Sequence, residues 1–172
     1  GLIALSSSMK GEIGKAILMN FPSEKLDKIV DEYIEIFSKE NFYLEIQANE
    51  LPETKVINDK FYEIAKLKNI ELVATNNIHY VDRDGYELQD IVICIQSGWK
   101  LKDKNRKRAV SKELYLKSKE EMQRSLDERF HKAIENTNYI ASLCNLEIEF
   151  GNLQFPYYEV PNQYSGMDEY LK

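Results

Sequence analysis

The chain has 172 residues, of which 43% are hydrophobic and 30% are charged. This composition is typical of a soluble folded domain and excludes an intrinsically disordered protein. The net charge of −6 argues against a free-standing nucleic-acid-binding protein. No apolar stretch approaches the ~20 residues that a membrane helix needs, so no membrane partner is expected.

Strands and helices alternate through the first half of the chain. The predicted elements are a strand at 2–5, a short helix at 11–20, a helix from Pro22 to Phe37 with Ser23 as its cap, a strand at 42–47, a helix from Pro52 to Asn69 with Val56, Ile57, Phe61, Ile64, Ala65 and Leu67 on its core side, and a strand at 70–74. Short connections between such elements indicate parallel strands with crossover helices, an α/β fold. Barrel and open-sheet arrangements fit this pattern equally.

The second half is predicted to be largely helical. We expect a helix at 84–97 that buries Leu88, Ile91, Val92 and Ile95, a basic irregular segment at 99–112, and helices from 118 to about 128 and on to 144. From Asn152 onward the prolines and tyrosines predict an extended linker that lies on another surface. The chain begins without Met and almost inside a strand, which predicts a piece of a longer protein.

The two cysteines lie far apart in apolar helical patterns. Cys94 and Cys144 are therefore expected to be buried free thiols. Nothing in their spacing suggests a disulfide framework, so a cytoplasmic setting is expected.

Glu45 and His79 are the candidate functional residues. Glu45 stands within a mostly apolar strand, where a carboxylate either points into a cavity as a ligand or base, or pairs with a buried base. His79 follows the end of the next strand, and residues at the carboxyl ends of adjacent parallel strands meet at one rim. A hydrogen-bonded structural role for His79 is the alternative. His131, in a charged helical context, is predicted to be a surface residue.

A strongly basic run extends from Lys100 to Arg108. Such a run is most often a solvated loop. It can also meet the phosphates of DNA, with Lys104, Arg106 and Arg108 as the candidate contacts, or an acidic surface of the same parent protein.

Several stretches, in order, resemble one family. They are GLIALSSSMKGEI, FYLEIQ, ELVATNNIHYVDRDGYELQDIVICIQSG, KDKNR, ELYLKSKEEM and IENTNYIASLCNLEIEF. Together they resemble the PHP (polymerase and histidinol phosphatase) domain of bacterial DNA polymerase III alpha subunits. The resemblance implies a partial distorted (β/α)7 barrel: residues 1–112 as its C-terminal half, residues 113–150 as a helical continuation, and residues 151–172 as a linker towards the polymerase palm. The early HxH metal ligands and the palm are absent.

The chain departs from the family at three expected metal ligands. Ser8 stands where the family has Cys, Asn49 where it often has His, and Asn77 where it has Asp. Glu45 and His79 are retained. Because Zn²⁺ and Mn²⁺ need thiolate, imidazole or carboxylate donors, we expect a vestigial metal site and no cofactor, with residual Zn²⁺ or Mn²⁺ binding as the alternative.

The resemblance implies a scaffold within a replicative DNA polymerase, whose palm would use Mg²⁺ to add nucleotides. The expected partners are the rest of the polymerase chain, the proofreading exonuclease subunit, and DNA through the parent. A metal-dependent phosphoesterase, acting as a 3′–5′ exonuclease or pyrophosphatase, is the alternative function. A stand-alone phosphatase is disfavoured, because the blocks between Tyr115 and Phe150 resemble the polymerase continuation.

Overall fold

The computed structural model describes residues 1–108, 111–153, 156 and 158–172. Ala109 and Val110 of the predicted basic segment, and Tyr157 of the predicted linker, lie outside the described residues. The elements are β1 (Ala4–Leu5), α1 (Glu12–Leu18), α2 (Ser23–Phe37), β2 (Phe42–Gln47), α3 (Pro52–Lys68), β3 (Glu71–Thr75), α4 (Gly85–Ser97), α5 (Lys119–Ser125), a 3₁₀ turn (Glu128–Phe130), α6 (His131–Leu143) and α7 (Met167–Tyr170). The α/β class predicted from the alternating pattern is confirmed.

The three strands form one parallel sheet in the order β1-β2-β3. Tyr43 of β2 aligns with Leu5 of β1 and with Glu71 of β3. Successive residues of a strand face opposite sides of the sheet. Phe42, Leu44 and Ile46 are fully buried and belong to the main apolar core with α1, α2, α3 and α6; Tyr43, Glu45 and Gln47 face the other side. The sheet is compatible with part of a barrel, and the barrel itself stays a prediction.

Helix α6 covers the outer edge of β3. The carbonyl of Thr75 accepts from Ala48 N, towards β2, so the alternate carbonyls of Leu72 and Ala74 point outward. Asn136 Nδ2 donates to Leu72 O at 2.7 Å, and Thr137 Oγ1 donates to Ala74 O at 2.8 Å. These side chains satisfy carbonyls that would otherwise invite another strand. Asn136 and Thr137 of the ENTNYIA stretch therefore have a structural role.

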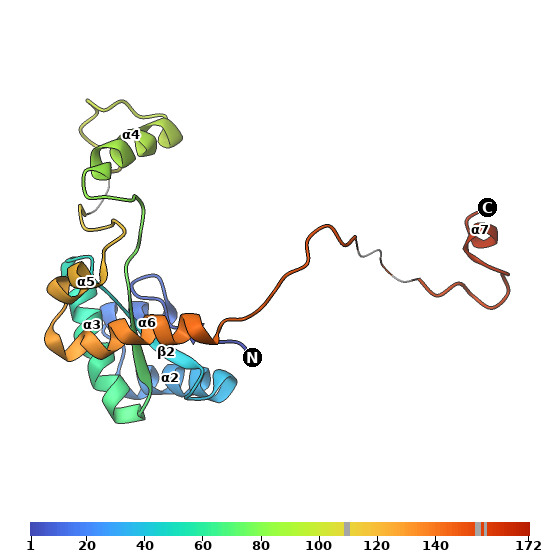
Figure 1. Ribbon diagram of the computed structural model, residues 1–172, viewed down its shortest axis with the longest axis horizontal. Coiled ribbons are helices and arrows are strands. Elements are labelled where there is room, and N and C mark those ends of the chain that lie inside the picture. The colour runs from blue at the N-terminus through green and yellow to red at the C-terminus, as the bar shows by residue number, and fades with distance from the viewer. Residues whose placement is uncertain (109–110, 154–155, 157) are drawn as a thin grey trace.

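Helix α4 and the basic segment after it form a lobe that projects away from the sheet (Figure 1). Of the four residues expected to be buried, Leu88, Ile91 and Ile95 are exposed and Val92 is half-buried, so that prediction is wrong. Cys94 is the buried residue of this helix. The reason is physical: periodicity correctly predicts an apolar stripe, but none of the described residues packs over it.

Other predictions also need correction. Ser23 is the first helical residue and makes no side-chain cap, because Pro22 occupies the cap position. Val56 and Leu67 flank the buried stripe of α3 and are exposed. Cys144 is exposed because it follows the last turn of α6.

His131, predicted to be a surface residue, is half-buried: it begins α6, and its Nε2 lies 3.2 Å from Gln123 O. Between α6 and α7 the described residues have no regular structure, and the chain leaves the sheet (Figure 1). The short helix α7 interrupts the predicted extended linker. Among the described residues, no helix is both long enough and apolar enough to cross a membrane.

Candidate functional site

Glu45 lies on the face of the sheet opposite the main core and is half-buried. Its Oε1 accepts from Thr75 Oγ1 at 2.5 Å and from Gln47 Nε2 at 3.4 Å. Its backbone amide donates to Ser6 Oγ at 2.9 Å. Neutral donors on two adjacent strands therefore hold one oxygen of the carboxylate, and among the described residues no buried base is hydrogen-bonded to it.

Asn49 is a structural residue at the end of β2. It is 1% exposed, its Nδ2 donates to Gln47 Oε1 at 3.1 Å, and its Oδ1 accepts from Leu51 N at 3.2 Å. Its carbonyl accepts from Ser111 Oγ at 3.0 Å. The side chain thus uses an amide donor and an amide acceptor at once, a combination that a metal-bound imidazole does not provide.

Ser8 is also buried, at 1% exposure, and packs against the backbone of α1. Its Oγ has no hydrogen-bond partner among the described residues. A lone neutral hydroxyl is a poor replacement for a thiolate as a zinc ligand. The chemistry of this position therefore does not favour a transition metal.

The segment after β3 carries the remaining candidates. Asn77 and His79 are exposed, and the His79 backbone amide donates to Leu114 O at 2.8 Å. Asn76, directly before Asn77, was not predicted to have a role. It donates through Nδ2 to Glu113 O at 2.7 Å and to Tyr115 O at 2.9 Å. An amide that follows a strand and precedes a histidine gave no sequence signal for this bridging role.

The candidate ligands do not make up a donor set for a metal cluster. Only Glu45 and His79 carry a carboxylate or an imidazole, whereas such clusters need several anionic or imidazole donors. The described residues contain no group of three or more His, Cys, Asp or Glu side chains placed to hold one ion. The residues present therefore do not fit a multinuclear metal centre.

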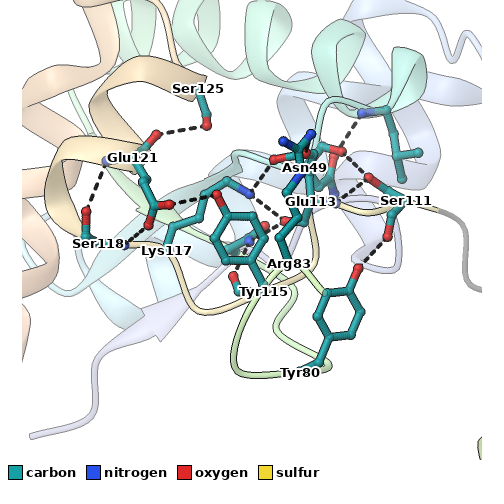
Figure 2. A network of polar contacts seen from close by, with 12 residues as sticks. Asn49, Tyr80, Arg83, Ser111, Glu113, Tyr115, Lys117, Ser118, Glu121 and Ser125 are labelled. Carbon is teal, nitrogen blue, oxygen red and sulfur yellow. Dashed lines mark hydrogen bonds and ion pairs between the residues drawn. The ribbon is translucent and has the colours of Figure 1, made fainter. Parts of the chain in front are cut away.

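A polar network on Lys117 holds the segment after β3 in place (Figure 2). The Lys117 side chain is 1% exposed, and its Nζ lies 3.1 Å from Glu113 Oε2 and donates to Glu113 O at 2.6 Å. The same Nζ lies 4.1 Å from the centre of the Tyr115 ring. Arg83 pairs with the other Glu113 oxygen at 2.6 Å, and Tyr80 Oη donates to Ser111 O at 2.7 Å. These contacts join residues 80–83 to residues 111–117.

The same network continues into α5. Ser118 and Glu121 form a capping box, and Tyr115 Oη donates to Glu121 Oε1 at 3.0 Å. The hydrogen bond from the Ser118 amide, followed by that from Tyr115, lowers the pKa of Glu121. Figure 2 shows the chain of contacts from Asn49 through Glu113 to Glu121. The LYLKS stretch thus has a structural role: its side chains connect Glu113 and the segment after β3 to helix α5.

The predicted DNA contacts fall into two kinds. Lys104 and Arg108 are exposed, whereas Arg106 is buried. Arg106 donates to both carboxylate oxygens of Asp90, at 2.6 and 2.5 Å, and to Leu101 O at 3.1 Å. The bonds to Asp90 raise the pKa of Arg106. Arg106 is therefore not available as a DNA contact, because its guanidinium is hydrogen-bonded to Asp90 and so connects the basic segment to α4.

The sequence is similar to those of known proteins of one kind. Residues 1–49 match the PHP domain family. The whole chain aligns with the DNA polymerase III subunit alpha of Pseudomonas aeruginosa at 36% identity over 177 residues, with that of Borreliella burgdorferi at 32% over 173, and with that of Treponema pallidum at 31% over 172. The chain spans only 14 to 15% of the length of these relatives.

Proposed function

The chain is homologous to one segment of bacterial DNA polymerase III alpha subunits, and from this we propose that it is a scaffold segment of a replicative DNA polymerase. Residues 1–112 would form the latter half of the PHP barrel, residues 113–150 its helical continuation, and residues 151–172 a linker towards the palm. In the intact parent the palm would perform Mg²⁺-dependent, DNA-templated nucleotide addition. The segment itself would brace that core.

The hydrogen bonding of Asn49 carries the scaffold proposal. The position that would offer a metal ligand is instead tied to Gln47, Leu51 and Ser111. Glu45 is likewise occupied by Thr75. Residues committed to fixed internal bonds support a bracing role better than a hydrolytic one, because a hydrolytic cluster must hold ions and activate water.

The proposed partners follow from the same homology. They are other regions of the polymerase chain and the proofreading exonuclease subunit, with DNA reached through the parent. Retention of Glu45 and His79 is the feature that keeps a metal-dependent phosphoesterase as the alternative, with Zn²⁺ or Mn²⁺ as its residual ion.

Titration of Zn²⁺ and Mn²⁺ into the intact protein, purified without chelator, tests the proposal. We expect near-zero bound metal by elemental analysis and no rise in melting temperature. Tightly bound metal that is lost in His79→Ala but kept in His131→Ala, the matched variant at the other histidine, would refute the vestigial site and favour the phosphoesterase.

Charge reversal on the basic segment tests the proposed DNA contact. Lys104→Glu with Arg108→Glu is expected to weaken binding of the intact protein to primer–template DNA. The slope of log affinity against log salt should fall by about 2, roughly 0.9 for each lost phosphate contact. Fluorescence anisotropy across a salt series measures both quantities. Reversal of exposed Lys28 and Lys39 on α2 and just after it is the control, and equal effects from the two pairs would rule out a specific contact.

A further inference from the structure

The projecting lobe carries an uncovered apolar stripe. Leu88, Ile91 and Ile95 recur at helical spacing along α4 and are 65%, 40% and 76% exposed. Trp99 and Leu101, which follow the helix directly in the sequence, are also exposed, at 46% and 53%. Several large exposed apolar side chains within one short segment indicate an interaction surface, whereas isolated ones would need no explanation. We name these five residues the α4 stripe.

The lobe is built to hold the stripe in one shape. Gly98 ends α4 in the left-handed conformation, and Trp99 N donates to Cys94 O at 3.0 Å. Arg106 clamps the returning segment onto Asp90. Cys94, on the same helix, is buried. A preformed surface loses little conformational entropy on binding, which favours a docking role.

The segment that follows α4 is rich in exposed cations, which we call the cationic rim. Lys100, Lys102, Lys104, Lys107 and Arg108 are all exposed, in a chain whose net charge is −6. The nearby Asp103 carboxylate accepts from Lys100 N, at 2.9 Å. The surface therefore combines exposed apolar side chains with exposed positive ones, whereas the chain as a whole carries a net negative charge.

We propose that the α4 stripe docks an acidic amphipathic protein segment, with apolar side chains on the stripe and carboxylates against the rim. Phosphates of DNA would match the rim but leave the stripe uncovered. A protein segment satisfies both the apolar and the charged part, which is why this occupant is favoured. The inference goes beyond the scaffold role and does not depend on whether Glu45 or His79 binds metal.

Trp99 makes the proposal directly measurable, because it is the only tryptophan in the chain. The probe is a synthetic helical peptide with leucine on one face and glutamate on its flanks, added to the intact protein. Where the parent contains further tryptophans, each is replaced by phenylalanine. We expect a saturable blue shift of Trp99 emission. A peptide with lysine in place of glutamate should bind about tenfold more weakly at low salt.

A pair of matched variants distinguishes specific docking on the α4 stripe from non-specific hydrophobic binding. Ile95→Glu on the stripe should abolish the shift, whereas Leu67→Glu, at a residue of similar exposure on α3, should leave it unchanged. Both sites are exposed, so both variants should fold. No shift, equal binding of the acidic and basic peptides, equal loss in the two variants, or a shift with single-stranded DNA or anionic vesicles but not with the acidic peptide would each overturn the proposal. None of these outcomes bears on the metal titration that tests the scaffold role.

Discussion

Replacement of Lys117 by Met is expected to lower the free energy of unfolding by about 3–5 kcal/mol. The methionine keeps most of the side-chain volume but removes the ammonium group. Glu113, itself buried, then loses its enclosed partner. Among the described residues its remaining ion-pair partner is Arg83, which is largely exposed and contributes little. Urea unfolding of the intact protein, followed by circular dichroism, measures the loss.

Two companion variants identify the cause. Lys119→Met, at an exposed position on the next helix, should change stability by less than about 0.5 kcal/mol. Adding Glu113→Gln to Lys117→Met should recover part of the loss, because the buried charge is then gone. If Lys117 and Lys119 variants behaved alike, the buried pair would not be what stabilises this region.

The Lys117 network also bears on the candidate site. Asn76 donates to the carbonyl of Glu113, and His79 N donates to that of Leu114. Loss of the ion pair should therefore loosen the segment after β3, visible as faster hydrogen exchange of the His79 amide. The apolar core around Phe61 should keep its protection, since Phe61 is fully buried in the main core and is not part of this network.

Gly14→Ala is expected to destabilise the chain by about 2 kcal/mol or more, despite the better helix propensity of alanine. A Cβ atom at Gly14 would lie 2.1 Å from the Ser8 carbonyl oxygen and 2.8 Å from the Ser8 carbonyl carbon. Both are backbone atoms, so no side-chain rotation relieves the overlap. Either α1 or the segment carrying Ser8 must move. Thermal and urea unfolding measure the change.

Gly166→Ala is the matched control. An added Cβ atom at Gly166 would meet nothing within 4 Å, and its φ of 171° is extended backbone that any residue adopts. We therefore expect no measurable change in stability. Equal stability of the two variants would show that the close approach of Ser8 to α1 is not maintained in solution.

Local signals predicted the elements close to the sheet. The Pro52 entry and Asn69 exit of α3 are confirmed, the latter in the left-handed conformation. Strands β2 and β3 lie within a residue of their predicted bounds. These features depend on backbone preferences and on periodic burial, both of which are written into short stretches of sequence.

The site depended on longer-range contacts. The sequence identified Glu45 and His79 by their types and their places near strand ends, but not Asn76, whose partners Glu113 and Tyr115 lie far along the chain. Lys117 was also not identified, although its partner Glu113 is only four residues away, because spacing alone does not show that the pair is buried. The buried state of Arg106 was likewise missed, because a basic run looks solvated until Asp90 is placed beside it.

By itself, then, the sequence determined the α/β class and the order of the strands and helices, and it showed neutral side chains at Ser8, Asn49 and Asn77, whose interpretation as a depleted metal site stays a prediction. Only the tertiary structure decided that the Asn49 and Asn76 side chains make internal hydrogen bonds and that the Arg106 and Lys117 side chains are buried. It also decided that the apolar side of α4 is exposed. The physical reason is that periodicity specifies an apolar face without specifying its partner. Whether a charged or apolar side chain is buried depends on residues that are distant in sequence and close only after folding.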